Sequence, residues 1–222
     1  MIEVTYIDHM GSDLSVVNAA RVSFGKKSEA LGEVGIGDDP IMVPVLHDND
    51  VRLIRYLAKH KHKSPFNHAF ATFHVKAPIF VARQLVKHEY MPWNEISRRY
   101  VNDKPEFYVP DVWRGKSADK KQGSEGEIQH IHIQTSQQIP LTLYEGLLDK
   151  GVCEEQARMV LPQNTMTEWY WSGSLDAFSS MCNLRCKPDT QEETRQVANQ
   201  IDRKMIELFP VSWDALTEDD DA

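Results

Sequence analysis

The spacing of hydrophobic residues changes several times along the chain, which predicts a mixture of helices and strands. Alternation over residues 2–7, and β-branched or aromatic side chains over residues 69–75 and 165–171, predict three strands. Helical spacing over residues 78–89 begins at Pro78, which suits a first helical turn. Further helices are predicted over residues 13–24, 51–58, 128–148 (with a break or kink at Pro140), 154–161, 174–184 and 191–208. The fold is therefore expected to be α+β, with helices in the majority.

Two segments show no clear period. Residues 25–49 are rich in glycine and contain two prolines, so a long inserted loop is expected there, either on the surface or covering a site. Residues 116–127 are polar and are predicted to form a second loop. The acidic residues 218–222 are expected to be a solvated tail, which leaves residues 1–217 as one domain.

Composition narrows the class of protein. With 222 residues, 41% hydrophobic and 26% charged, the chain suits a globular protein with a substantial core. A net charge of −8 argues against a nucleic-acid partner, and no apolar run is long enough to suggest a membrane partner. Three cysteines are too few for a disulfide framework, so a reducing, cytoplasmic location is predicted. Cys182 and Cys186, four residues apart, are interpreted as buried apolar residues.

The segment over residues 87–100 carries the most informative polar pattern. Glu95, Ser97 and Arg99 stand at every second position, so they would project from one face if the segment were extended. A carboxylate, a hydroxyl and a guanidinium on one face suit a phosphorylated polar ring. Arg98 and Arg99 are adjacent, and arginine is suited to bidentate phosphate binding.

Arg158 and Arg185 also stand among apolar neighbours. A partly buried arginine needs an anionic ligand or an acidic partner. The acidic partners available nearby in sequence are Glu155, Glu192 and Glu193, and the residues alone leave the choice open between an internal salt bridge and a ligand.

The residues also allow three other interpretations. Tyr90, Trp93 and Tyr100 beside the paired arginines would suit base stacking, but the overall acidity disfavours it. No metal site is expected from the histidines, because no acidic residue falls at a familiar ligand spacing from them: His60, His62, His68 and His74. A catalytically inactive nucleotide- or flavin-binding subunit is a third alternative.

Several ordered motifs resemble the flavin-dependent thymidylate synthases. Members of that family carry Arg-His-Arg, a spacer and then a Ser, usually ending in Asn-Glu-x-Ser-x-Arg-Tyr. The tail is similar here at residues 94–100, whereas the head reads Lys87-His88-Glu89 and agrees only at His88. Further family elements resemble residues 18–23, 62–68, 77–84, 157–162, 183–185 and 191, in the family's order.

This resemblance implies a helix-rich catalytic domain with a central, mainly antiparallel sheet. It implies reductive methylation of dUMP to dTMP, with methylenetetrahydrofolate as the carbon donor and FAD, reduced by NADPH, as the hydride source. No cysteine nucleophile is used, and the family works as a homotetramer with shared sites. In family terms the catalytic Arg185 stabilises a uracil ring ionised at N3.

The resemblance also implies two sets of ligand-binding residues. The dUMP set is Gln84, Lys87, Glu95, Ser97, Arg98, Arg99, Arg158 and Arg185. The FAD set is Ser23, His62, Ser64, Lys87, His88, Glu89, Glu95, Ser174 and Ser180.

Departures from the family pattern concentrate in the flavin set. Lys87 lacks the planar donor fork of an arginine, and Glu89 would repel a pyrophosphate. Ser174, Asp176 and Ser180 lie where the family often has asparagine and arginine. FAD is therefore expected to be held differently, with help from residues 25–49, or weakly. The alternatives are a related C5 modification, such as hydroxymethylation of dUMP, and a nucleotide-binding subunit without synthase activity.

Overall fold

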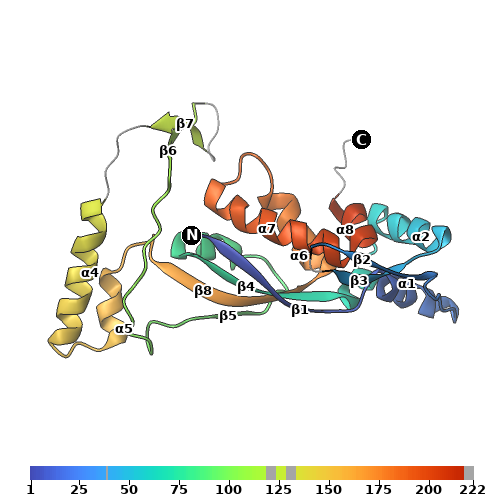
Figure 1. Cartoon of the computed structure of the whole chain (residues 1–222), viewed down its shortest axis with the longest axis horizontal. Coiled ribbons are helices and arrows are strands. Elements are labelled where there is room, and N and C mark those ends of the chain that lie inside the picture. Colours follow the sequence, from blue (N-terminus) through green and yellow to red (C-terminus); the bar gives the residue numbers. More distant parts are fainter. Residues whose placement is uncertain (39, 119–123, 129–133, 218–222) are drawn as a thin grey trace.

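The protein is built on a four-stranded antiparallel sheet (Figure 1), seen in a computed structural model that describes residues 1–38, 40–118, 124–128 and 134–217. The strand order is β1-β4-β8-β5, formed by Glu3–Met10, Phe70–Pro78, Met166–Ser174 and Trp93–Glu95. Each neighbouring pair is antiparallel, which confirms the expected sheet type. All three strands predicted from the sequence belong to this sheet.

Helices cover the sheet and make the other wall of the core. The helices that pack on one another are α1 (Asp13–Arg21), α2 (Asp48–Lys59), α6 (Leu175–Arg185), α7 (Glu192–Leu208) and α8 (Pro210–Thr217), and α6 and α7 also contact the sheet. Two short 3-10 helices join them, η1 (Val22–Phe24) and η2 (Ser64–His68). No helix in the described part of the chain is long and apolar enough to cross a membrane.

Aromatic side chains from adjacent strands fill the centre of the core. Phe73 of β4 pairs in register with Trp171 of β8, and both are fully buried. Phe178 of α6 packs edge-on against Phe73 at a centroid distance of 5.3 Å and against Trp171 at 5.4 Å. The alternating burial of β4 follows its period of two, because every second side chain faces this cluster. The packing fixes the position of the start of α6 above the sheet.

Both segments predicted as loops contain strands. Within residues 25–49, β2 (Gly32–Ile36) and β3 (Ile41–Val45) form a hairpin, so the expected loop contains regular strands; its role as an insertion that covers a site stays a prediction. Residues 116–127 contribute to a second hairpin of β6 (Trp113–Lys116) and β7 (Ser124–Ile128), although residues 119–123 lie outside the described chain. Glycine and polar residues hide the alternation in both cases. The acidic tail over residues 218–222 also lies outside the described residues.

The predicted helices are confirmed, but several of them begin or end at residues other than those predicted. α4 (Gln134–Asp149) continues through Pro140, where a break or kink was predicted, and Ile128 belongs to β7 instead of this helix. α5 (Glu154–Ala157) is followed by η3 (Arg158–Val160). α3 (Ile79–Leu85) ends four residues before the predicted boundary at Glu89. Lys87, His88 and Glu89 therefore lie in a turn and not on a helix.

The segment after β5 is not extended. β5 ends at Glu95, and residues 98–100 form a turn. The expectation that Glu95, Ser97 and Arg99 share one strand face is therefore wrong beyond Glu95.

Candidate active site

A groove of about 760 Å³ lies where the turn after α3 meets the start of α6. We call it the Lys87 groove. Its lining includes five of the residues predicted to contact FAD, which come from two distant parts of the sequence: Lys87, His88, Glu89, Ser174 and Ser180. Lys87 and Glu89 are exposed, and His88 is half-buried. The structure thus gathers more than half of the predicted flavin set in one place.

Two polar residues of the groove were missed from the sequence, Lys63 and Asn67. Asn67 Oδ1 accepts a hydrogen bond of 2.5 Å from the hydroxyl of Ser174, which also caps α6 by accepting from the Ala177 backbone at 3.3 Å. Lys63 Nζ lies 3.3 Å from Asp176 Oδ1. Lys63 follows His62 in the motif over residues 62–68, so its place in that motif could have marked it as a site residue from the sequence. Asn67 therefore adds an amide to the groove, and Lys63 adds a second cation beside that of Lys87.

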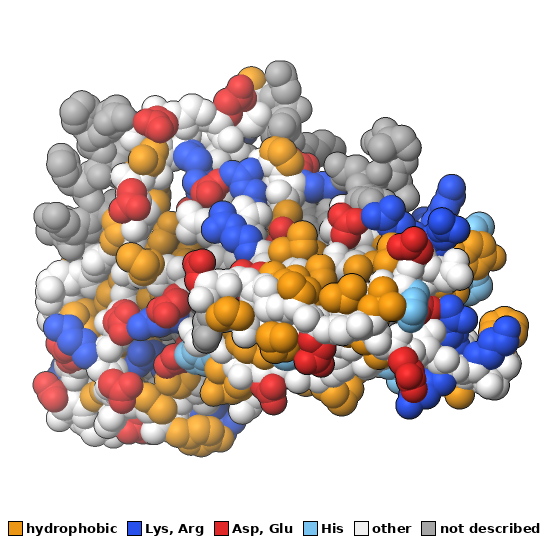
Figure 2. Space-filling model, turned by 45° about the vertical axis from the view of Figure 1, so that its right-hand side comes forward, with side chains coloured by type: hydrophobic (Ala, Val, Ile, Leu, Met, Phe, Trp, Pro, Cys, Tyr) orange, Lys and Arg blue, Asp and Glu red, His pale blue; other side chains and the backbone are white. Residues whose placement is uncertain are grey.

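A second cavity, of about 860 Å³, adjoins the groove and contains His62. The two cavities share Lys63, Asp176 and Ser180. Figure 2 shows Lys, Arg and His side chains gathered toward the right-hand end of the molecule, where α2 lies in Figure 1. Cations on this cavity come from α2 and the residues after it: Arg55, Lys59, Lys61 and Lys63. Such clustering favours an anionic ligand.

Backbone strain coincides with these cavities. Lys61 (φ 56°) and Tyr90 (φ 60°) are the non-glycine residues with positive φ in the described chain, and one lines each cavity. A residue other than glycine in this region is disfavoured by its Cβ, and such strain concentrates at binding sites. The feature supports a functional role for both cavities.

Three predicted flavin residues lie outside the two cavities. Ser23 belongs to η1 and Ser64 begins η2, and both are exposed. Glu95 lies on β5, where its carboxylate accepts hydrogen bonds from Thr167 Oγ1 at 2.6 Å and Trp93 Nε1 at 3.2 Å. None of the three lines the Lys87 groove or the second cavity, although Ser64 directly follows Lys63, which lines both.

Arg185 meets His88 at the edge of the groove. Arg185 Nε donates a 3.1 Å hydrogen bond to His88 Nε2, so His88 must be unprotonated at that nitrogen. Burial, together with the nearby Arg185 charge, lowers the pKa of His88 from 6.5 to about 4. Among the described residues no carboxylate pairs with Arg185, and Glu192 and Glu193 instead pair with Arg195 and Arg114. At neutral pH the guanidinium therefore faces a neutral partner and keeps its full charge for a ligand.

Gln84 lies at one end of a chain of hydrogen bonds. Its Nε2 donates to Gln191 Oε1 at 2.6 Å, and Gln191 Nε2 donates to Glu193 Oε2 at 3.1 Å. Glu193 is only 4% exposed and forms an ion pair of 2.6 Å with Arg114. α3, α7 and β6 are thus joined through polar contacts that begin at a residue predicted to bind nucleotide.

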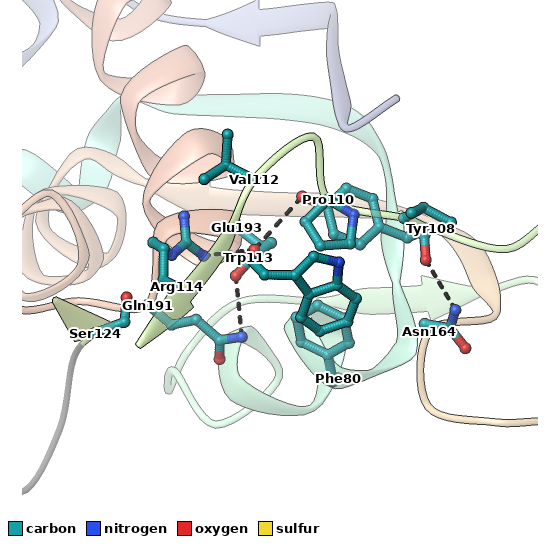
Figure 3. Close-up of a pocket in the computed structure, with 11 residues that line it drawn as sticks. Phe80, Tyr108, Pro110, Val112, Trp113, Arg114, Ser124, Asn164, Gln191 and Glu193 are labelled. Atoms are coloured by element: carbon teal, nitrogen blue, oxygen red, sulfur yellow. Dashed lines mark hydrogen bonds and ion pairs between the residues drawn. The ribbon is translucent and has the colours of Figure 1, made fainter. Parts of the chain in front are cut away.

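An aromatic cavity of about 630 Å³ adjoins this chain of bonds (Figure 3). Phe80, Tyr108 and Trp113 line it, and Figure 3 shows the bonds among Gln191, Glu193 and Arg114 at one side. Burial and the Glu193 charge raise the pKa of Tyr108 to about 12, so its hydroxyl stays protonated. None of the predicted ligand residues lines this cavity. Its connection to the site is the contact between Gln191 and Gln84.

A second group of predicted nucleotide residues surrounds Glu155. Arg99 Nε lies 3.2 Å from Glu155 Oε2, and Arg158 Nε donates to the Glu155 backbone oxygen at 3.3 Å. Arg158 is exposed, contrary to the expectation of partial burial, and its contact with Glu155 is not the salt bridge considered from the sequence. Nearby, Ser97 Oγ accepts from Arg99 N at 3.3 Å, and Arg98 Nη1 donates to Asp103 O at 2.9 Å. Two exposed guanidinium groups near one another suit a phosphate.

The two groups of nucleotide residues lie in different parts of the chain. Gln84, Lys87 and Arg185 come from α3, the turn after it and the end of α6. Arg99 and Arg158 belong with α5, which packs on α4, whereas α6 packs on α7 and α8. Figure 1 shows α4 and α5 at one end of the long axis, well apart from α6. A single chain therefore does not bring the predicted dUMP set together.

The sequence matches the family model described as thymidylate synthase complementing protein over residues 5–211. Among curated relatives, the flavin-dependent thymidylate synthase of Thermus thermophilus is 40% identical over 219 residues, covering 97% of this chain and 75% of the relative. The enzyme of the same name from Thermosipho africanus is 37% identical over 216 residues, covering 94% and 88%.

A solved structure supports the same relationship. The UMP/dUMP methylase PolB from Streptomyces cacaoi, bound with 5-Br dUMP, superposes with a TM-score of 0.82 at 33% identity, covering 98% of this chain and 95% of PolB. Sequence and fold agree over nearly the whole length. This chain belongs to the thymidylate synthase complementing protein family, whose named relatives are flavin-dependent thymidylate synthases.

Proposed function

We propose that this protein converts dUMP to dTMP by reductive methylation, using methylenetetrahydrofolate as the carbon donor and FAD reduced by NADPH. The observation that carries the proposal is the contact between Arg185 and His88 beside the Lys87 groove. It leaves a guanidinium with its full charge next to a cavity large enough for a ligand. The family membership and the dUMP-analogue complex of PolB support the same substrate.

Arg185 would act on the uracil ring by electrostatic stabilisation. A permanently charged guanidinium lowers the free energy of a ring ionised at N3, and ionisation raises the electron density at C5, where the new bond forms. His88 supports this role because, at neutral pH, it orients Arg185 without adding or removing charge. The reaction needs no cysteine nucleophile, and among the described residues none of the three cysteines lines the Lys87 groove.

The residues of the Lys87 groove fit a flavin dinucleotide. Lys63 and Lys87 supply cationic donors, Asn67 supplies an amide, and the neighbouring cavity with His62 provides further length. When bound, reduced flavin would supply the hydride. Glu89 and Asp176 place two carboxylates among these donors, so we expect looser binding of the pyrophosphate than two additional arginines would give.

The divided nucleotide set supports a homotetramer with shared sites. We infer that Gln84, Lys87 and Arg185 of one chain meet the group around Arg99 and Arg158 of another, with Ser97 and Arg98 beside the phosphate. An exposed apolar face on α4, which includes Ile139 and Leu143, is suited to burial between chains. Ser23 and Glu95 would then complete the flavin site from other chains.

Product analysis tests the proposal directly. Purified protein is incubated with dUMP, methylenetetrahydrofolate, FAD and NADPH, and the nucleotides are resolved by mass spectrometry. Formation of dTMP only in the complete mixture is expected. 5-Hydroxymethyl-dUMP in place of dTMP, or no product from protein that binds dUMP, would contradict the proposal. A parallel reaction with UMP determines whether this protein also methylates UMP, which PolB is named for alongside dUMP.

A further inference from the structure

Helices α6 and α7 bring two thiols and a carboxylate together, away from the groove residues. Cys182 lies on α6, Cys186 caps the end of that helix one turn later, and Asp202 faces them from α7. The ligand atoms of all three lie within 4.8 Å of one another. Side chains that converge from two packed helices in this way are close enough to ligate one ion together.

The burial of the three residues differs in a way that suits an ion. Cys182 is 2% exposed, and its thiol points to the Ala198 carbonyl oxygen at 3.7 Å. Cys186 and Asp202 are half-buried, so the cluster is closed on the core side and reachable from solvent on the other. An ion could enter past Cys186 and keep water as a fourth ligand.

The carboxylate is already oriented by a neighbour. Trp213 Nε1 of α8 donates a 2.8 Å hydrogen bond to Asp202 Oδ1. Partners of this kind fix a ligating group and are a regular part of metal sites.

We propose that Cys182, Cys186 and Asp202 bind one thiophilic divalent cation of the Zn²⁺ class per chain. A donor set of two thiolate sulfurs and one carboxylate oxygen binds Zn²⁺ and Cd²⁺ in preference to Mg²⁺ and Ca²⁺. None of these three residues takes part in the proposed reaction. Because Arg185 immediately precedes Cys186, an ion here would join the end of α6 to α7 directly beside Arg185.

Metal titration of the purified full-length protein tests the site. After treatment with a chelator and a reductant, Cd²⁺ is added and the ultraviolet thiolate-to-metal charge-transfer band is followed. Zn²⁺ affinity is measured by competition with a chromophoric chelator. One ion per chain is expected, with release of protons as the thiols ionise. Saturation below one ion per two chains, or no charge-transfer band, would overturn the proposal.

Matched variants locate the ion. Cys186→Ser and Asp202→Asn change half-buried residues, and the asparagine keeps an acceptor for Trp213. Each should weaken Zn²⁺ binding at least tenfold. Cys153→Ser removes the exposed thiol elsewhere and should leave the affinity unchanged. Equal affinities in Cys186→Ser and Cys153→Ser would place the ion at other residues and refute the site.

A stability measurement separates binding from misfolding. Zn²⁺ should raise the thermal unfolding midpoint of the wild-type protein and of Cys153→Ser, because an ion that binds only the folded state stabilises it. The midpoint of Cys186→Ser should not respond. A Cys186→Ser variant that unfolds at the wild-type temperature without metal yet shows the same rise with Zn²⁺ would also overturn the proposal.

Discussion

Arg185 and His88 form a pair whose total charge depends on the protonation of His88. His88 accepts from Arg185 through Nε2, which is possible only while the imidazole is neutral. Burial and the adjacent guanidinium both disfavour the charged ring. The pair therefore keeps one positive charge at neutral pH and gains a second, repulsive charge only in acid.

We predict that His88 titrates near pH 4. The folded pKa of about 4 lies below the ordinary 6.5, so the unfolded chain takes up this proton first as the pH falls. The stability associated with neutral His88 is present in full above pH 6.5, declines as the pH falls toward 4, and is absent below. The measurement is the chemical shift of the ring protons by NMR, assigned with His88→Gln.

The same titration in Arg185→Gln separates the two causes of the shift. Removing the guanidinium should raise the pKa of His88, while burial, the larger cause, should keep it below 6.5. A wild-type His88 that titrates at 6.5 would show that the contact with Arg185 is not formed in solution.

Arg185→Lys should largely abolish dTMP formation while leaving the fold intact. Lysine keeps the charge but presents a compact ammonium without two parallel donors, so it does not reproduce the geometry at a planar ring. Loss of one such electrostatic contact typically lowers the rate about 10²–10³-fold. Steady-state product formation is measured, with circular dichroism and dUMP binding as controls. Near-normal turnover in a folded variant would argue against the assigned role.

Glu89→Arg should strengthen FAD binding. Glu89 is exposed in the Lys87 groove, and the change removes a negative charge and adds a donor near the expected pyrophosphate. A gain of roughly three- to tenfold in affinity at low salt is expected, and it should shrink as salt screens the charge. FAD affinity is measured by flavin fluorescence, and Glu89→Gln should lie between the two. If all three proteins bind FAD equally, Glu89 points away from the cofactor.

At the scale of elements, the hydrogen-bonded chain from Gln84 to Arg114 shows how a short hairpin is tied to the core. β6 contributes Arg114, and α7 contributes the buried Glu193. Figure 1 shows the β6–β7 hairpin projecting from the body of the protein, so this ion pair is one of its attachments. The same contacts hold Gln191 against Gln84.

Arg114→Ala is predicted to lower the free energy of unfolding by about 3–5 kcal/mol, because it leaves a buried carboxylate without its cation. Urea denaturation at fixed protein concentration gives the value. Arg114→Ala combined with Glu193→Gln should recover part of the loss, since the second change removes the unpaired charge. No loss in Arg114→Ala would mean that solvent reaches Glu193.

Sequence patterns predicted three of the four strands of the main sheet, and most helices, because the side chains on their two faces differ in burial. β4 alternates between half-buried and buried positions from Phe70 to Ala77, so its period is visible in the residues. β2 and β7 are almost fully exposed, and no alternation marks them. The end of α3 was missed because Val86 extends the apolar spacing of the helix, although its side chain is 46% exposed in the turn. Exposed hairpins and frayed helix ends are set by contacts that a single sequence does not display.

The candidate site was predictable as a set of residues but not as an arrangement. Motif order identified Gln84, Arg185 and the residues of the Lys87 groove. It could not show that Lys63 and Asn67 join them, because their approach depends on how η2 packs on α6. Nor could it show that Arg158 is exposed and separate from Arg185, since that follows from the position of α5 on α4.

At the scale of the whole molecule, the divided nucleotide set makes a prediction about mixed oligomers. Arg185→Gln damages one half of the inferred site, and Arg158→Gln damages the half that a second chain would supply. Each variant alone should be nearly inactive. In an equal mixture that has exchanged subunits, about a quarter of the sites combine two intact halves, because each half comes from an undamaged chain half of the time. dTMP formation should therefore return to roughly a quarter of the wild-type rate.

The control for this experiment places both changes in one chain. The double variant Arg158→Gln with Arg185→Gln is mixed with an equal amount of wild-type protein. If sites are shared between chains, about a quarter of them combine two intact halves. If each chain held its own site, about half of the sites would be intact. Exchange is verified by native mass spectrometry of differently tagged chains. Activity that stays absent in the exchanged mixture of single variants would mean that both arginines act within the same chain. That outcome would require α5 to move toward α6, because the structure holds the two at different places along the long axis.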